Sequence, residues 1–326
     1  MMIRAVLFHF AILGIAFCKP AGDSSTVILR FGGDVLLAAR YEEGVGANLT
    51  TAFDGFDLFR TDDLSIVNLE CPVTTRGTRR VKPFTFRMKP AALSAITSAG
   101  IEVVNLANNH IYDYGSIGLF DTIHSLDSAR IAHVGAGRNR AEARTPFLKV
   151  IKGRRIAVLG YYGPGESPVA TNKSSGVAPR QSDVIAEDIR SLRDSRRADY
   201  IVIIFHWGTE KATVPDNEQR VLAHQVIDAG ADAVIGHHPH VLQGIERYKH
   251  GVIVYSLGNL IFGGNSRHTY DTGLFEIRLV GESPKYEFIP VRVKNWNAQM
   301  LSGKDGDQLL YRMRKLSTIF PRSIFN

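Results

Sequence analysis

Polar side chains that can bind metal ions recur at one kind of position in this sequence, directly after short apolar runs. The positions are Asp34, Glu70, Asn108 to His110, His206 and the cluster His237 to His240. The apolar runs are predicted strands, and open α/β sheets place their active sites at the carboxyl ends of their strands. Asp, Glu, Asn and His side chains at five strand ends predict a metal-dependent hydrolytic centre.

Two carboxylates are the acidic candidates for this centre. Gly32 and Gly33 let the backbone turn tightly enough to aim Asp34 inward, although an Asp after glycines is also a common turn residue. The alternation of a strand puts Asn68 and Glu70 on one face, which suits a carboxylate that bridges metal ions beside an amide. A helix cap or a turn is the alternative interpretation of this second pair.

The run from Asn108 to His110 supplies an oxygen ligand and an imidazole within a single turn. Phosphoesterase chemistry uses such a pair to hold metal and to stabilise a leaving group. Asp113 lies three residues beyond His110 and can orient that imidazole as a supporting carboxylate. We therefore predict catalytic roles for His110 and Asp113.

His206 follows the most apolar strand of the chain, with Trp207 beside it and Glu210 four residues later. A histidine at such a strand end is either a core residue or a ligand, and the neighbouring Glu210 and a shielding Trp207 favour the ligand. Asn259 ends a later apolar run, where it would bind substrate or form a turn.

The cluster His237, His238 and His240 is the strongest single indication of metal binding, because neutral imidazoles are common ligands of zinc, iron and manganese. His238 and His240 are separated by one residue, so extended geometry puts them on one side, and His237 is expected to face elsewhere.

Apolar runs alternate with helical periodicities, which predicts an α/β fold with a layered sheet. The predicted strands are Val27–Phe31, Leu64–Leu69, Val103–Leu106, Ile156–Tyr161, Tyr200–Phe205, Ala233–Ile235 and Val252–Leu257. The predicted helices are Pro90–Ala99, Ile117–Ser128, Asp183–Ser195 and Asn217–Ala229. A hairpin (Leu274–Leu279 and Tyr286–Val293) and a terminal helix (Asp305–Leu316) follow.

Composition is that of one large globular domain: 326 residues, 44% hydrophobic and 22% charged. The net charge of +7 favours an acidic partner, such as a polyanion, a phosphate ester or an anionic membrane surface. We interpret the basic groups at Arg76–Lys82 and Arg193–Arg197 as solvated surface. No nucleic-acid-binding motif accompanies them, so nucleic acid is not expected as a partner.

The first 18 residues are predicted to form a signal peptide. Arg4 precedes an apolar run from Ala5 to Phe17, which is shorter than the roughly 20 residues that span a bilayer. Small residues at Ala16 and Cys18 favour cleavage after Cys18. Lipid attachment at Cys18 and an uncleaved anchor are the alternatives. We expect export to the cell envelope, periplasmic or extracellular, with residues 19–326 as one domain and no intramolecular disulfide.

Seven short motifs follow one another in order: Gly33–Leu36, Asn68–Glu70, Ala107–His110 with Asp113–Gly115, Gly135–Gly137, His206–Glu210, Gly236–Val241 and Ser256–Asn259. Together they resemble the CapA/PgsA family of poly-γ-glutamate capsule synthesis proteins, whose fold is related to the calcineurin-like metallophosphoesterases. The resemblance covers roughly residues 27 to 295. It implies a metallophosphoesterase-like sandwich of β-sheets flanked by helices.

The resemblance also implies a set of roles. The implied metal ligands are Asp34, Glu70, Asn109, His206, His238 and His240. His110 resembles the proton donor, and Asn108 is an alternative to Asn109 because the phosphoesterase motif has a single Asn before its His. Leu36 replaces the histidine of the usual Asp-x-His motif, so we expect one or two divalent ions (Mn, Zn or Fe) with one held more tightly. Glu210 is expected to assist catalysis, and Asn108, Trp207, His237 and Asn259 to contact substrate.

Three functions are compatible with these residues. The first is a metal-dependent hydrolase that acts on an anionic polymer such as poly-γ-glutamate, together with membrane-bound capsule synthesis machinery. The second is a phosphodiesterase of the calcineurin-like type. The third is a non-catalytic protein of capsule assembly that uses the site to bind polymer.

Overall fold

The structure, a computed structural model, describes residues 25–281 and 283–326. The predicted signal peptide, residues 1–18, lies outside this range. Within the described range, no helix has the length and apolar character needed to cross a membrane.

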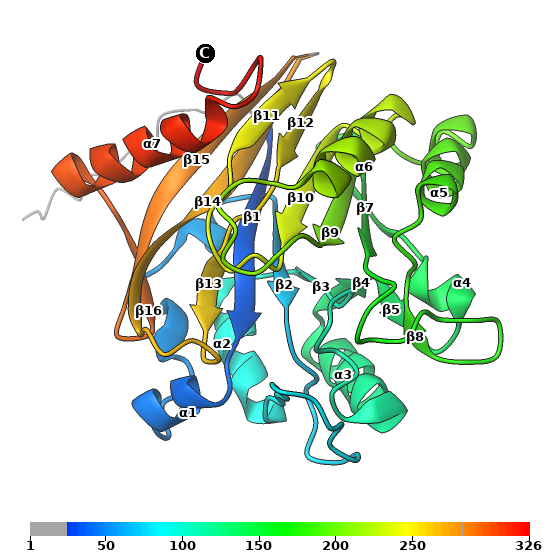
Figure 1. The fold of residues 1–326 in the computed structure, drawn as a ribbon, viewed down its shortest axis with the longest axis vertical. Coiled ribbons are helices and arrows are strands. Elements are labelled where there is room, and N and C mark those ends of the chain that lie inside the picture. Colours follow the sequence, from blue (N-terminus) through cyan, green and yellow to red (C-terminus); the bar gives the residue numbers. More distant parts are fainter. Residues whose placement is uncertain (1–24, 282) are drawn as a thin grey trace, which may run out of the picture.

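Two mixed β-sheets lie against each other and are flanked by helices (Figure 1). The first has eight strands, in the order β16 (Asn297–Met300), β15 (Ser283–Lys294), β14 (Thr269–Val280), β1 (Val27–Leu36), β2 (Leu64–Leu69), β3 (Val103–Asn105) and β4 (Ala132–Val134), with β13 (Asn259–Phe262) also paired to β1. The second has six, in the order β11 (Ile245–Tyr248), β12 (Gly251–Val254), β10 (Ala233–His237), β9 (Tyr200–His206), β7 (Arg154–Tyr161) and β6 (Phe147–Ile151). A short pair, β5 (Ala136–Gly137) and β8 (Gly176–Val177), stands apart.

The central strands are apolar throughout because both of their faces are buried. Along β9, Val202 and Ile204 pack into the core between the two sheets. Ile201 and Ile203, which alternate with them, pack under the helices on the outer face of the second sheet. This alternation explains why the run reads as continuously hydrophobic.

Helices cover the outer face of each sheet (Figure 1). The first sheet is covered by α2 (Leu93–Ala99) and α3 (Gly115–Ala129), the second by α5 (Ser182–Asp194) and α6 (Asn217–Asp228). Two short helices, α1 (Arg40–Val45) and α4 (Arg140–Ala143), lie in loops, and α7 (Gly303–Ser317) packs against β15 and β11. A capping box of Asp216 and Gln219 fixes the start of α6.

The predicted helices, the hairpin and the predicted strands are all present within a few residues. The prediction was wrong about the end of the first strand, because β1 continues past Phe31 to Leu36. Parallel pairing with β13, with Asp34 opposite Asn259, extends it. Asp34 therefore lies inside a strand, and Asn259 begins β13 instead of ending the strand before it.

Parallel pairing brings the candidate residues to one edge. β1 runs parallel to β2, and β2 to β3. In the second sheet β9 runs parallel to β10, with His206 opposite His237. The carboxyl ends of strands from both sheets therefore meet at one end of the sandwich.

Candidate metal centre

Asp34 is buried at the junction of β1, β2 and β13. Its backbone N–H donates to the carbonyl of Gly258 at 2.9 Å. The two chains approach so closely there that a Cβ on Gly33 would lie 2.1 Å from the Gly258 oxygen, so only glycine fits before this aspartate. The Asn68 amide donates to Oδ1 of Asp34 at 2.9 Å. Backbone packing therefore fixes the position of the carboxylate.

Two imidazoles face the Asp34 carboxylate. Nδ1 of His237 lies 3.2 Å from Oδ1, and Nδ1 of His240 lies 3.2 Å from Oδ2. Burial by itself would raise the pKa of Asp34, but the hydrogen bonds and charges of His237 and His240 outweigh it and hold that pKa well below its usual value. Asp34 is therefore ionised at neutral pH.

Glu70 follows β2 and is fully buried between the two sheets. Its Oε1 lies 3.6 Å from Nε2 of both His206 and His240, and this oxygen has no hydrogen-bond partner. Burial first, and then the charge of Asp34, raise the pKa of Glu70 well above its usual value. A buried carboxylate in this position requires either a proton or a cation.

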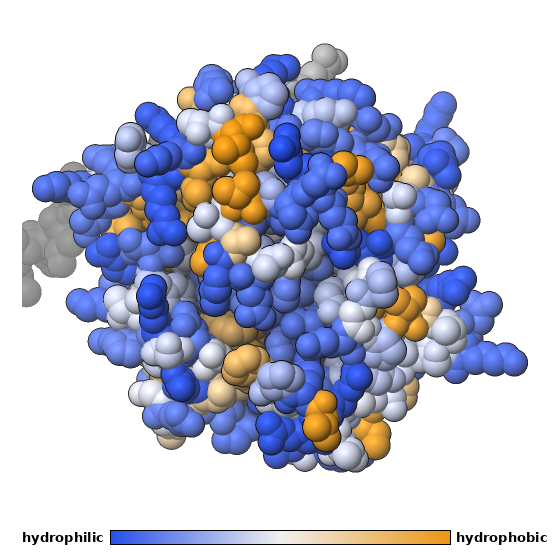
Figure 2. Space-filling model, viewed as in Figure 1, coloured by the Kyte–Doolittle hydropathy of each residue, from blue (hydrophilic) through white to orange (hydrophobic). Residues whose placement is uncertain are grey.

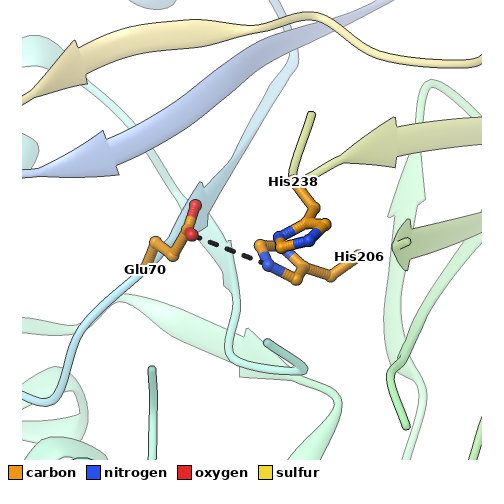
Figure 3. Close-up of side chains that lie close together, drawn as sticks. All are labelled: Glu70, His206 and His238. Atoms are coloured by element: carbon orange, nitrogen blue, oxygen red, sulfur yellow. Dashed lines mark ion pairs between the residues drawn. The ribbon is translucent and has the colours of Figure 1, made fainter. Parts of the chain in front are cut away.

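His206, at the end of β9, and His238, just after β10, lie ring against ring with 4.6 Å between their centroids (Figure 3). Nε2 of His206 is 2.8 Å from Oδ1 of Asn109. Burial, followed by the charge of His238, lowers the pKa of His206 well below its usual value, and burial followed by His240 lowers the pKa of His238 to about 4. Both rings are therefore neutral at pH 7 and can act as metal ligands.

Three groups of side chains each bring ligand atoms within 4.8 Å of one another: Glu70, His206 and His238; Asp34, Glu70 and His240; Glu210, His238 and His240. Glu70 belongs to the first two, so it is placed to bridge two neighbouring ions. Oε1 of Glu70 and Nδ1 of His238 are buried without a hydrogen-bond partner. Mixed carboxylate and imidazole donors suit zinc, manganese or iron, so these residues fit a divalent metal centre.

All three histidines of the cluster face this centre, and the expectation that His237 faces elsewhere was wrong. β10 ends at His237, and His238 and His240 have φ of 97° and 56°. Alternation holds only in extended backbone, so it does not apply beyond His237. His237 is only 1% exposed and lies against Asp34, so it supports that carboxylate instead of contacting substrate.

His110 lies beside the candidate metal ligands and is held by Asp113, whose Oδ2 is 2.9 Å from Nδ1 of His110. The sequence-based expectation for Asp113 matches this contact. Burial lowers the pKa of His110, and the hydrogen bond that its Nδ1 donates to Asp113 opposes that effect. Phe86 packs on the imidazole with 4.8 Å between centroids and donates its backbone N–H to Asp113.

Lys82 is a residue that sequence reasoning missed, because it belongs to a basic group that we interpreted as solvated surface. Its side chain is only 10% exposed, and Nζ lies 2.6 Å from Asp113 and 3.3 Å from Nδ1 of His110. The loop between β2 and α2 carries it there. The sequence offers no periodicity in that loop from which its burial could be predicted.

The amides form a second layer behind the carboxylates. Asn68 donates to both Asp34 and Glu70, and Asn105 and Asn108 donate to the Asn68 carbonyl oxygen. The signal in the sequence is a polar residue within an apolar strand, as at Asn105.

Asn108 and Trp207 do not face the cavity, contrary to the expectation of substrate contact. Oδ1 of Asn108 accepts the N–H groups of His110 and Ile111, so the side chain shapes the turn that presents Asn109. Trp207 is 2% exposed and packs between Phe205 and Tyr255. Adjacent strand residues face opposite sides of a sheet. Because His206 faces the candidate metal centre, Trp207 packs under the helices on the outer face of the second sheet.

Glu210 is exposed, and its carboxylate lies close enough to the rings of His238 and His240 for the three side chains to bind one ion together. Oδ1 of Asn259 accepts a hydrogen bond from Nδ1 of His240 at 2.8 Å. Both residues line a cavity of about 480 Å³ that also contacts His110 and His240. The site is therefore open to a substrate on this side.

Comparison with known sequences places the chain among capsule proteins. Residues 28–264 match the profile of the family described as bacterial capsule synthesis protein PGA_cap. The PGA biosynthesis protein CapA of Bacillus subtilis is 32% identical over 90% of this chain and 79% of its own length. The capsule biosynthesis protein CapA of Bacillus anthracis is 38% identical over 59% of this chain, a stretch that spans 47% of that relative.

Comparison with solved structures identifies the fold. The NAD nucleotidase of Haemophilus influenzae superimposes with a TM-score of 0.54 at 10% identity, over 90% of this chain and 56% of that protein. A putative 5'-nucleotidase of Staphylococcus aureus gives 0.51 at 15% identity, over 89% and 58%. These neighbours have the metallophosphoesterase fold, which confirms the predicted fold class.

Proposed function

The chain belongs to the family of bacterial capsule synthesis proteins PGA_cap, and from this premise we propose that it is an exported, metal-dependent hydrolase that processes an anionic polymer such as poly-γ-glutamate. Capsule synthesis machinery at the membrane is its proposed partner. The predicted signal peptide supports export, and the net charge of +7 supports an acidic substrate.

The observation that carries this proposal is the pair of neighbouring ligand sets that share Glu70. One set comprises Asp34, Glu70 and His240, and the other adds His206 and His238 to Glu70, with Asn109 beside His206. Divalent ions held there would polarise the oxygen of the scissile bond and supply a water nucleophile at neutral pH. A site built only to stabilise the fold would have no need of an open cavity next to it.

His110 is placed to move a proton during bond cleavage. Asp113 holds Nδ1, which leaves Nε2 as the nitrogen available to a substrate in the cavity. In hydrolysis of an amide bond, water provides hydroxide to the carbonyl carbon and a proton reaches the departing nitrogen as the C–N bond breaks. Lys82 lies beside the pair, with its Nζ 2.6 Å from Oδ1 of Asp113, and helps to fix the position of that carboxylate.

The test combines metal analysis with turnover. The purified protein is loaded with manganese or zinc, its metal content is determined, and it is incubated with poly-γ-glutamate and with bis(p-nitrophenyl) phosphate. We expect shortening of the polymer that a chelator abolishes and that His110→Ala slows without loss of metal. Metal-loaded protein that binds polymer and leaves its length unchanged would favour the non-catalytic capsule-assembly role.

Phosphodiester hydrolysis is a second candidate, and a specific observation favours it. The solved structures with the same fold include an NAD nucleotidase and a putative 5'-nucleotidase. Rapid cleavage of bis(p-nitrophenyl) phosphate together with an intact polymer would support this alternative over the first.

A further inference from the structure

Two cavities adjoin each other beside the metal centre and share part of their walls. The first, of about 480 Å³, is lined by Phe84, Phe86 and Phe262 and reaches Arg40. The second, of about 640 Å³, extends past Tyr270 toward α7. The residues that line both are Lys211, His240, Asn259, Asn265 and Ser266. The metal-binding residue His240 therefore lies where the two arms of one groove join, not at the bottom of a closed pocket.

Four cationic side chains line this groove: Arg40 in the first arm, Lys211 at the junction, and Arg267 and Arg312 in the second arm. All four are exposed, and the ion pairs of the described residues include none of them. Asp271, an acidic residue of the second arm, is neutralised by Arg292 at 2.6 Å. Glu210 is the acidic residue of the first arm and lies close to His238 and His240, so each arm still carries more positive than negative side chains.

Some other arginines of the surface have their charge compensated. Arg144, Arg155 and Arg193 each pair with a carboxylate of a neighbouring element. Hydrophilic residues dominate the face of the molecule drawn in Figure 2, with hydrophobic residues in small separate groups. The groove therefore gathers four cations that form no ion pair with a described residue, and a ligand bound there can supply their counter-charges.

The first arm combines this charge with an apolar wall. Phe84 and Phe86 are stacked with 6.4 Å between centroids, and Phe86 contacts Phe262 edge to face at 6.2 Å. Phe84 is 62% exposed, so its ring is available to a ligand. A γ-linked glutamate chain has two methylene groups and one carboxylate in each residue, which matches phenyl rings bordered by cations.

We propose that this groove binds an extended chain of carboxylates that crosses the metal centre, with Arg40 and Lys211 on one side and Arg267 and Arg312 on the other. The inference rests on the proposed function, because it identifies how the polymer passes that same site. A chain that continues in both directions is cut within its length, and its two new ends leave by opposite arms.

The binding test removes two cations of the second arm. All proteins carry His110→Ala, so that polymer stays intact, and are loaded with metal. Fluorescence anisotropy of labelled poly-γ-glutamate measures affinity for the parent, for Arg267→Ala with Arg312→Ala, and for Lys304→Ala with Arg314→Ala. The last pair removes the same charge from exposed positions of α7 that do not line the groove. We expect about a tenfold loss of affinity for the groove variant, since each exposed ionic contact contributes up to roughly 1 kcal/mol.

The control variant should bind within about twofold of the parent, and both double variants should keep their metal content. If the two double variants bound the polymer with equal affinity, the proposal that the polymer lies along the groove would be overturned. Displacement of the polymer by a mononucleotide at equal concentration would also overturn it, in favour of a nucleotide ligand.

Product lengths from the protein with His110 intact test the path of the chain. Cleavage within the polymer lowers its mean length early, whereas release of single glutamates from an end leaves the mean length almost unchanged and would overturn the proposed path. The polymer could bind with the expected dependence on Arg267 and Arg312 and yet remain uncut. That result would refute hydrolysis and would still support polymer binding in the groove.

Discussion

The two sheets supply different chemistry to the same centre. The first sheet provides oxygen atoms, from Asp34, Glu70 and Asn109, and the second provides the nitrogen atoms of His206, His238 and His240. Imidazole and carboxylate ligands together suit zinc, iron or manganese, and the sandwich brings them together because strands of the two sheets end at the same place.

The two sides also differ in how firmly they are held. The oxygen side rests on amides that hydrogen bond to one another, with Asn68 donating to both carboxylates. On the nitrogen side, His238 has a buried Nδ1 without a partner and a φ of 97°. The fold itself therefore organises the oxygen side, whereas a bound ion would complete the nitrogen side.

The largest effect is expected from the residue that joins the two sides. Glu70→Gln keeps the shape of the side chain and removes the negative charge that both ligand sets share. We expect elemental analysis to show loss of both ions and of activity. In metal-free protein the same change should raise the thermal midpoint at neutral pH, because the raised pKa of Glu70 shows that the buried charge destabilises the fold.

Wild-type metal content in Glu70→Gln would contradict the bridging role. A lower midpoint in the metal-free state would instead indicate that the hydrogen bond from Asn68 outweighs the cost of the buried charge.

The nitrogen side is tested by His238→Ala and His240→Ala, which should each lose metal while the chain remains folded. Both residues lie on the loop after β10, and the cores on the two sides of the second sheet do not depend on them. Metal content and the far-ultraviolet spectrum are the measurements. His124→Ala is the matched control, because His124 is exposed on α3. Full metal content in both loop variants would exclude these residues as ligands.

His110→Ala should separate catalysis from metal binding. His110 contacts Asp113 and Lys82 and belongs to neither shared ligand set. Loss of a proton-transfer group typically lowers the rate about 10² to 10⁴-fold, so turnover should fall within that range while metal content stays unchanged. A variant that lost metal as completely as His240→Ala would make His110 a ligand.

The positions of most site residues could be predicted from the sequence, because a polar residue after an apolar run marks the end of a buried strand. Side-chain direction after a strand could not be predicted. His237 was misplaced because positive φ at His238 ended the alternation, and Lys82 was missed because a loop without periodicity buries it. Trp207 was predictable in principle, since it is adjacent to His206 and must face the opposite side.

The two ligand sets should differ in affinity. Leu36, where phosphoesterases of this pattern have a histidine, packs in the core under the first sheet. This leaves Asp34, Glu70 and His240 in one set, against Glu70, His206, His238 and the neighbouring Asn109 in the other. Titration of apo-protein with zinc or manganese should therefore give two affinities with a wide gap, or a single site. Two equally tight ions would contradict this difference and strengthen the phosphodiesterase alternative.

The smallest effect concerns a half-buried carboxylate next to the first sheet that belongs to none of the candidate ligand sets. Asp62 lies just before β2, far along the strand from Glu70, and its Oδ2 is buried without a hydrogen-bond partner. Burial first raises its pKa to about 7, Arg30 opposes that rise, and Glu102 adds to it. The folded state therefore holds a proton that the unfolded chain releases near pH 4, so stability from this group is complete below pH 4 and is lost as pH rises through 7. Asp62→Asn should match the wild type at pH 4 and exceed its thermal midpoint above pH 7, by a few degrees at most.

Asp307→Asn, at an exposed position of α7, is the control. A constant difference across this pH range would show that the carboxylate of Asp62 is ionised in the folded protein, and that burial at this end of the sheet needs no ion to compensate it.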